Sequence, residues 1–373
     1  MQSLDNNTKA FLELVRAGLW EKEAHLLPYG EVDYEEIMRL AEEQSVVGLV
    51  AAGLDHVIDV KLPKEFVLQF VGQAIHLEQQ NAAMNSFIGE IVEKMREQGI
   101  YTILVKGQGI AQCYARPLWR SSGDVDLFLS DENYVKARLC LVPIASSVEI
   151  EGKYTKHLGM TIKSWVVELH GSLRCALSSR IDRALDLIKI DTFHGGNVRS
   201  WMNGKTQVFL LSVENDSIYV FTHFLNHFYK GGIGIRQICD WCRLLWTYRE
   251  NIDHNLVSKR LEEMGLVSEW KAFGAFAVET LGMPAYAFPL YDSKSRWKRK
   301  AARINRFVIE SGNFGHNRNS DYLGKYPFFV RKTISLYRRV GDLCRHASIF
   351  PLDSFRFFPK MMWHGLTSAM RGE

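Results

Sequence analysis

Two aspartates stand one residue apart in the stretch GDVDLF, which runs from Gly123 to Phe128. The apolar residues around them predict a strand, and residues i and i+2 of a strand point to the same side. Asp124 and Asp126 would therefore hold two like charges close together, and such charges repel each other. Divalent metal ions commonly compensate paired carboxylates. The stretch is therefore a candidate metal site, although short acidic pairs also occur at strand ends without a catalytic role.

A third carboxylate and a glycine turn accompany this pair. Glu168 lies inside the apolar stretch SWVVELH, which also predicts a strand, and the strand ILVKG ends at Gly107, where a helix is expected to begin. Such a turn exposes backbone N–H groups that suit a phosphate. If the strands are neighbours, the three carboxylates converge on one site for Mg²⁺ or Mn²⁺. Two such ions activate an attacking oxygen and stabilise a departing pyrophosphate, so the pattern predicts metal-assisted nucleotidyl transfer.

The block VKGQGIAQCYARPLWRSSGDVDLFL resembles the uncharacterised nucleotidyltransferase family 5, whose hallmark is K-G-x-x-L-A-x-x-x-Y followed by R-x-x-G-D-[IV]-D-[IL]. The residues that match are Lys106, Gly107, Tyr114, Arg120, Gly123, Asp124 and Asp126. The segment VVELHGSL is similar to a second block of the family, with Glu168, Leu169 and His170. The segment HFLNHFYKGGIGIRQICDW resembles a third block, with His223, His227, Arg236 and Asp240.

This family belongs with the DNA-polymerase-β-like nucleotidyltransferases. The resemblance therefore implies a small mixed sheet with flanking helices, a divalent metal held by Asp124, Asp126 and Glu168, and an NTP donor. It also implies that Gly107 and Gln108, with Gly123 nearby, place backbone against the phosphates, whose charge Lys106 and Arg120 neutralise. The acceptor stays open: a small molecule, a saccharide, a protein side chain or an RNA end.

Gln108 stands where the wider superfamily has Gly or Ser, the residue that helps to hold the triphosphate. This difference favours an alternative hypothesis, a sensor or assembly module that binds Mg·NTP without turnover.

Several of the matching residues keep two interpretations. Arg120 either clamps a phosphate with its fork of donors or forms an ion pair with one of the aspartates. His170 shares the strand face of Glu168 and either orients a carboxylate or is a structural histidine. The residues of the third block, together with Tyr114, form either a polar network that faces the nucleotide or a structural helix–helix network.

The pairs His223/His227 and Cys239/Cys242 contain the residue types of a zinc site. However, the sequence GIRQICDWCRLLW reads as one amphipathic helix and lacks the glycine-bearing knuckle of a zinc ribbon. We therefore interpret the two cysteines as core residues.

The chain has 373 residues, of which 47% are hydrophobic, and a formal net charge of +4. This composition is globular, and the charge is too small to imply nucleic-acid binding by itself. Helical periodicity predicts an N-terminal helical region over 1–99, with one long helix over 63–98. Over 100–200 we expect a nucleotidyltransferase-like α/β core, and over 201–373 a C-terminal helical region. The fold class is therefore α+β, a small mixed β-sheet flanked by helices at both ends.

Within the core, period-two patterns predict strands over 101–107, 124–130, 146–152, 156–163 and 164–170. A capped helix is expected to begin at Ser130, and helical patterns return from Arg180. The glycine-rich segment over 193–206 is expected to be irregular.

The six cysteines are scattered, the N-terminus lacks the layout of a signal peptide, and no apolar run is long enough to span a bilayer. A cytoplasmic protein is therefore expected. The segment 293–345 is rich in Lys and Arg. It predicts either contact with an anionic surface, including RNA as a weaker functional alternative, or a solvated helix face.

Overall fold

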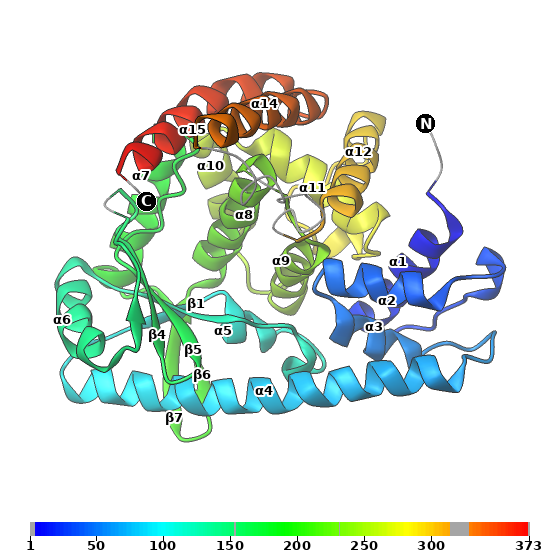
Figure 1. Ribbon diagram of the computed structural model, residues 1–373, viewed down its shortest axis with the longest axis horizontal. Coiled ribbons are helices and arrows are strands. Elements are labelled where there is room, and N and C mark those ends of the chain that lie inside the picture. Colours follow the sequence, from blue (N-terminus) through cyan, green and yellow to red (C-terminus); the bar gives the residue numbers. More distant parts are fainter. Residues whose placement is uncertain (1–3, 153, 231, 314–327, 372–373) are drawn as a thin grey trace.

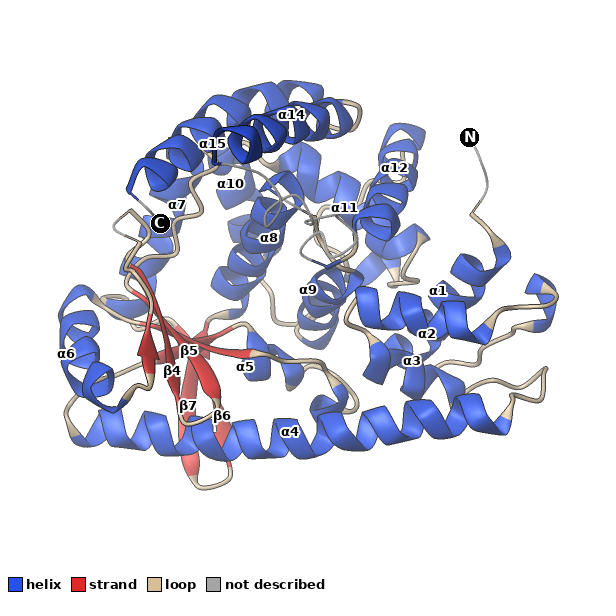
Figure 2. Cartoon of the chain, in the orientation of Figure 1, coloured by secondary structure: helices blue, strands red, loops and turns tan. Residues whose placement is uncertain are grey.

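The computed structural model describes residues 4–152, 154–230, 232–313 and 328–371. A mixed sheet of seven strands lies between helices, in the order β3-β4-β5-β2-β1-β7-β6. Helical regions flank it at both ends of the chain (Figures 1 and 2). The predicted α+β class, a small mixed sheet flanked by helices, is confirmed.

The first part of the chain is helical. Its elements are α1 (Asn6–Trp20), η1 (Leu27–Tyr29), α2 (Tyr34–Glu43), α3 (Val47–Leu54) and α4 (Lys64–Glu97). The long helix α4 follows Pro63 and stops before Gly99, whose φ of 68° is a conformation that favours glycine. It runs along one edge of the molecule, beneath both the sheet and the N-terminal helices (Figure 1). The helix predicted over 63–98 is therefore confirmed.

The middle of the chain contains every strand of the sheet. Its elements are β1 (Ile103–Val105), α5 (Gly107–Ala111), η2 (Pro117–Trp119), β2 (Asp124–Phe128), α6 (Asp131–Leu141), η3 (Val142–Ile144), β3 (Ser147–Val148), β4 (His157–Ile162), β5 (Trp165–His170), α7 (Ser179–Phe193), β6 (Val198–Asn203) and β7 (Thr206–Leu211). Strand β2 is parallel to β5 and antiparallel to β1, which is parallel to β7.

The C-terminal part is helical again. Its elements are α8 (Val213–Lys230), α9 (Ile235–Thr247), α10 (His254–Met264), α11 (Val267–Glu279), η4 (Ala285–Ala287), α12 (Ser295–Ser311), α14 (Phe328–Ala347) and α15 (Pro351–Arg371). Helices α8 and α9 lie between the sheet and the pair α14/α15, which lies opposite α4 (Figure 1). No helix within the described ranges is both long and apolar enough to cross a membrane.

The two faces of the sheet have different chemistry. Val125, Leu127 and Leu169 face a buried apolar cluster that includes side chains of α4 and α6. The opposite face carries Phe128, which belongs to the larger cluster around α8, α9 and α11, and it carries the acidic residues of the same strands. This alternation follows from the period of two along each strand.

Two predictions about the strands are wrong. The segment over 193–206, expected to be irregular and to lead directly into helices, contains β6 and the start of β7, joined by a turn at Gly204 with φ 60°. Strand β7 pairs with β1 and buries Val208 and Leu210, so the sheet continues past residue 200. The strand expected over 146–152 is confined to the exposed pair Ser147–Val148 at the sheet edge.

A close contact between α3 and the segment before β2 yields a first prediction. A Cβ atom at Gly48 would lie 1.8 Å from the carbonyl oxygen of Trp119. We expect Gly48→Ala to lower the free energy of unfolding by about 3 kcal/mol, because the backbone must move apart. Urea unfolding monitored by circular dichroism measures the change.

The control is Gly72→Ala on the exposed side of α4, where an added Cβ meets no atom within 4 Å. It is expected to raise the free energy of unfolding by about 0.5–1 kcal/mol, since alanine favours a helix more than glycine does. Equal effects of the two substitutions would contradict the close contact.

Candidate active site

Three carboxylates converge on one face of the sheet. Strands β2 and β5 are parallel neighbours, with Asp126 directly opposite Glu168, and Asp124 shares the face of Asp126. The nearest oxygen atoms of Asp124, Asp126 and Glu168 all lie within 4.8 Å of one another. The sequence predicted this convergence on the condition that the two strands are neighbours, and they are.

Two cationic side chains compensate part of this negative charge. The Nζ of Lys106 and the Nε2 of His170 each lie 2.7 Å from Oδ1 of the buried Asp126. Burial disfavours the charged forms of both side chains, but the attraction of Asp126 outweighs it and raises the pKa of Lys106 and of His170. Protein side chains therefore supply part of the positive charge at this site.

Asp124 is the least compensated of the three carboxylates. The charge of Asp126, and secondarily burial, raise the pKa of Asp124 above its ordinary value. No hydrogen bond or ion pair from a cationic side chain to Asp124 is found within the described residues. An additional cation would relieve this repulsion, and clustered carboxylate oxygens are the donors that Mg²⁺ and Mn²⁺ prefer. The residues present therefore fit a divalent metal ion.

His157 belongs to the site, although the sequence analysis did not identify it. Its Nε2 lies 3.0 Å from Oε2 of Glu168, and Nε2 of His170 lies 3.4 Å from the same oxygen. Burial alone would raise the pKa of Glu168, but hydrogen bonds from the two histidines lower it. His157 stands at the start of the correctly predicted strand β4. Only the antiparallel pairing of β4 with β5, which sets His157 opposite His170, brings it beside Glu168.

Arg120 is bound to the helical region rather than to the aspartates of β2. Its Nε and one terminal nitrogen each donate at 2.7 Å to the carboxylate of Asp240 on α9, in a bidentate pair. The Tyr114 hydroxyl donates to the same carboxylate at 2.8 Å, and all three side chains are buried. Of the two interpretations of Arg120, the ion pair is present, but its partner is Asp240.

The turn at Lys106 and Gly107 has an unusual backbone. Both residues have positive φ, 58° and 43°. Positive φ is uncommon for a residue with a side chain and often marks a functional turn. The side chain of Gln108 is buried and donates to Asn81 on α4 at 2.7 Å and to Ser122 at 3.2 Å. It therefore fastens the turn to α4 and leaves the space in front of the carboxylates open.

Two adjoining cavities meet at the carboxylates. The first cavity, of about 340 Å³, is lined by Gly107, Gly123 and the guanidinium-bearing residues Arg120 and Arg236, among others. The second cavity, of about 380 Å³, extends along β5 and α8 on the side of His157 and His170. Both are lined by Lys106, Asp124, Glu168 and His223. A ligand in either cavity can therefore reach the carboxylate cluster.

Arg236 and the two histidines of α8 line these cavities from the helical side. Arg236 donates to the carbonyl of Ser121 at 3.3 Å, while its buried Nε has no hydrogen-bond partner among the described residues. Burial, together with the charge of Arg120, lowers the pKa of Arg236. The Nε2 atoms of His223 and His227 lie 3.1 Å apart. Burial and the nearby Lys106 lower the pKa of His223 and lower that of His227 to about 4, so both imidazoles are neutral at pH 7.

The two cysteines of α9 lie in the core of the helical region. Cys239 and Cys242 are buried core residues, and burial raises the pKa of both thiols. Neither belongs to a group of potential metal ligands within the described ranges, and all six cysteines are free thiols. These observations agree with the interpretation of Cys239 and Cys242 as core residues.

The basic segment 293–345 is described in part, because residues 314–327 lie outside the described residues. In α12, Lys298 pairs with Glu279 at 2.8 Å, and Arg296 stacks over Trp297 at 4.5 Å. Contact of this segment with an anionic surface stays a prediction.

A family model described as an uncharacterised nucleotidyltransferase matches residues 30–282, more than half of the chain. The matched range contains the whole sheet, both cavities and the three blocks noted in the sequence. The chain belongs to the uncharacterised nucleotidyltransferases. Neither the search of curated proteins nor the search of solved structures found a match. The family resemblance inferred from the sequence is thus confirmed, and nucleotidyl transfer is the general activity that it supports.

The buried ion pair between Arg120 and Asp240 can be tested with the variant Asp240→Asn. We expect a loss of about 3 kcal/mol in the free energy of unfolding, because the Arg120 charge stays buried without its counterion. Urea unfolding gives the value. The control is Asp55→Asn, whose partner Arg116 lies 2.7 Å away at the surface and whose loss is expected to cost below about 1 kcal/mol. Losses of similar size for the two variants would contradict a structural role of the Arg120–Asp240 pair.

The neutral histidines predict a pH dependence of stability. The unfolded chain binds a proton at His227 near pH 6.5, whereas the folded protein does so near pH 4. Stability is therefore fully present above pH 6.5 and declines as the pH falls toward 4, by at most about 1.4 kcal/mol per pH unit for this residue. Urea unfolding of wild type and His227→Gln between pH 4.5 and 7 should show a shallower decline for the variant. His194→Gln, at an exposed position, is the control and should retain the wild-type slope.

Proposed function

We propose that this protein transfers a nucleotidyl group from an NTP to a hydroxyl group of an acceptor and releases pyrophosphate. One observation carries the proposal: Asp124, Asp126 and Glu168 converge where two cavities meet, in a chain that belongs to the nucleotidyltransferases. Two cavities that adjoin one carboxylate cluster suit a reaction between two substrates.

The carboxylate cluster would hold one or two divalent metal ions, Mg²⁺ or Mn²⁺. Asp124, Asp126 and Glu168 are the proposed ligands, and the raised pKa of Asp124 supports a need for additional positive charge. When bound, such ions neutralise phosphate charge and increase the acidity of an attacking hydroxyl group. His170, at 2.7 Å from Asp126, would orient that carboxylate.

The first cavity is proposed to bind the NTP. It combines the Lys106–Gly107 turn and Gly123 with Arg236, whose Nε lacks a partner among the described residues. Arg236 is thus the guanidinium best placed to donate to a phosphate, because the fork of Arg120 is already occupied by Asp240. Arg120 would act mainly by holding the segment before β2 in place, together with Tyr114.

The acceptor is proposed to enter from the side of Glu168. Its hydroxyl oxygen bonds to the α-phosphorus of the NTP while the bond from that phosphorus to the α,β-bridging oxygen breaks. The bridging oxygen leaves with the electron pair as part of pyrophosphate. The hydroxyl proton passes to a water molecule, and Glu168, which contacts His157 at 3.0 Å and His170 at 3.4 Å, would orient the hydroxyl by accepting its hydrogen bond.

The alternative function, an Mg·NTP sensor or assembly module without turnover, depends on Gln108. Its side chain bonds to Asn81 and Ser122 and does not line the first cavity. The replacement of Gly or Ser by Gln therefore does not obstruct the cavity, and we rank turnover ahead of sensing.

The proposal is tested by calorimetric titration of each NTP with Mg²⁺ into wild type and into Asp124→Asn/Asp126→Asn. We expect the preferred NTP to bind wild type and to bind the double variant about 100-fold more weakly, a loss of about 2.7 kcal/mol. Pyrophosphate is assayed in the same samples with hydroxyl-bearing acceptors added. The variant should release it at least about 100-fold more slowly.

Asp55→Asn, which removes a surface carboxylate, serves as the control and should bind and react like wild type. Failure of every NTP to bind wild type at millimolar concentration would contradict the proposal. NTP binding with no pyrophosphate release from any acceptor class would favour the sensor instead.

A further inference from the structure

We infer that the second cavity binds the acceptor, and that this acceptor is an uncharged, polyhydroxylated small molecule such as a saccharide or a cyclitol. The inference rests on the proposed transfer reaction. It selects one among the acceptor classes that the sequence left open.

The position of the second cavity suits an acceptor. The cavity shares Lys106, Asp124, Glu168 and His223 with the first cavity, so a molecule bound there adjoins the carboxylates without occupying the Gly107 turn or Arg236. Its volume of about 380 Å³ falls in the range of small-molecule sites. A hydroxyl of the bound molecule can thus approach Glu168 from the second cavity while the NTP occupies the first.

Seven of the fifteen residues that line this cavity carry uncharged hydrogen-bonding groups. They are hydroxyl, amide and imidazole side chains, namely Thr155, Ser172, Tyr219, Thr222, His223, Asn226 and His227. The buried Oδ1 of Asn226 has no hydrogen-bond partner among the described residues. An unsatisfied buried acceptor of this kind costs about 1–3 kcal/mol, which a ligand hydroxyl would recover. Neutral imidazoles both donate and accept hydrogen bonds, as hydroxyl groups do.

The positive charges around this cavity are already paired. Lys106 and His170 each contact Asp126 at 2.7 Å. Arg174 donates to Asp186 through two nitrogens, at distances between 2.7 and 3.1 Å. A phosphorylated acceptor or an RNA end would need unpaired cations, and the described lining residues of the second cavity offer none that lacks an acidic partner. The lining therefore favours a neutral acceptor.

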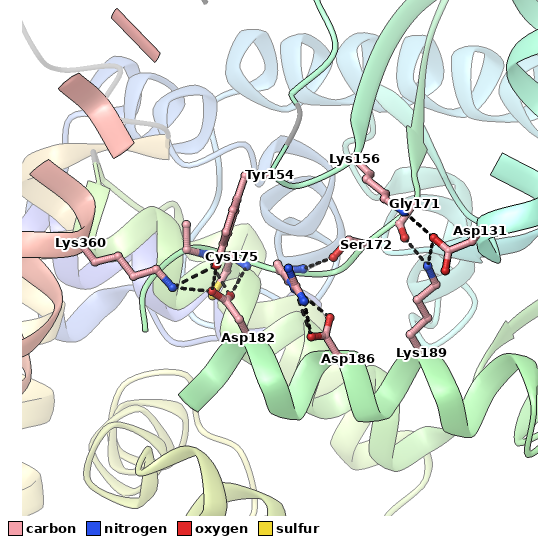
Figure 3. Close-up of polar contacts among 12 residues, drawn as sticks. Asp131, Tyr154, Lys156, Gly171, Ser172, Cys175, Asp182, Asp186, Lys189 and Lys360 are labelled. Atoms are coloured by element: carbon pink, nitrogen blue, oxygen red, sulfur yellow. Dashed lines mark hydrogen bonds and ion pairs between the residues drawn. The ribbon is translucent and has the colours of Figure 1, made fainter. Parts of the chain in front are cut away.

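Charged residues of α7 fix the wall of the cavity in place. Residues 172–175, which follow β5, form this wall. Asp182 accepts hydrogen bonds from the backbone N–H groups of Cys175 and Ala176, both at 3.1 Å. It also accepts hydrogen bonds at 2.7 Å from the hydroxyl group of Tyr154 and from the ammonium group of Lys360, which lies on α15 (Figure 3). Further along α7, Lys189 donates to the carbonyl of Gly171 at 2.6 Å (Figure 3). A wall held in this way is preorganised, as selective recognition of a small molecule requires.

The test uses the full chain with Mg²⁺ and its preferred NTP, and measures pyrophosphate release and nucleotidylated product by mass spectrometry. The neutral probes are glucose, N-acetylglucosamine, trehalose and myo-inositol. The charged probes are glucose 6-phosphate and a short RNA with a free 3′-hydroxyl. We expect product from at least one neutral probe, with a kcat/KM at least about tenfold above that of either charged probe, a ratio equivalent to about 1.4 kcal/mol.

Asn226→Ala should raise the KM of the neutral acceptor at least about tenfold and leave the Kd of Mg·NTP unchanged. Ser172→Ala should act in the same direction more weakly, and unchanged NTP binding shows that each variant is folded. Asn255→Ala, at an exposed position of α10, should leave both constants unchanged.

The outcomes separate this inference from the proposed function. Absence of NTP binding would refute the proposed function itself. Product formed from RNA or glucose 6-phosphate in preference to the neutral probes would overturn the inference and leave nucleotidyl transfer intact. NTP binding without product from any neutral probe, or an unchanged acceptor KM in Asn226→Ala, would also overturn it.

Discussion

Repulsion among three carboxylates on one face of a sheet is the constraint around which this molecule is arranged. Burying like charges is costly unless cations and hydrogen bonds surround them. Lys106 reaches Asp126 from the end of β1, and His170 and His157 hold Glu168 from β5 and β4. None of these contacts involves Asp124, and the charge of Asp126 together with burial raises the pKa of Asp124. The described side chains therefore compensate the charge of the carboxylate cluster only in part, which is the property expected of a site that binds metal ions.

A second constraint joins the sheet to the helices that cover it. The carboxylate of Asp240 on α9 receives Arg120 and Tyr114, both from the segment between β1 and β2. This buried contact fastens α9 to the segment before β2. Residues of α9 line the first cavity, and residues of α8 line both cavities. The family match extends to residue 282 and includes these helices. The site is thus a joint product of the sheet and the helical region, and neither part alone encloses the cavities.

The proposed acceptor side depends on contacts beyond the family match. Lys360 lies on α15, after residue 282, and binds Asp182, which supports the wall of the second cavity. The residues that line both cavities lie inside the matched range. A C-terminal helix outside the matched range thus supports the wall of the cavity in which we propose that the acceptor binds.

The sequence by itself identified Asp124, Asp126 and Glu168 as a candidate site, because the alternation of side chains along a strand and the family motif can both be read from neighbouring residues. It also determined α4, whose helical periodicity and flanking Pro63 and Gly99 mark both ends. Only the tertiary structure showed that β2 pairs in parallel with β5 and that β7 belongs to the sheet. It also showed that His157 lies beside Glu168 and that Asp240 is the partner of Arg120. Arg120 and Asp240 are 120 residues apart, and no local pattern encodes which distant charge a buried arginine will meet. Such choices follow only from packing the whole chain, because the energy that selects them comes from desolvated contacts formed after the elements have assembled.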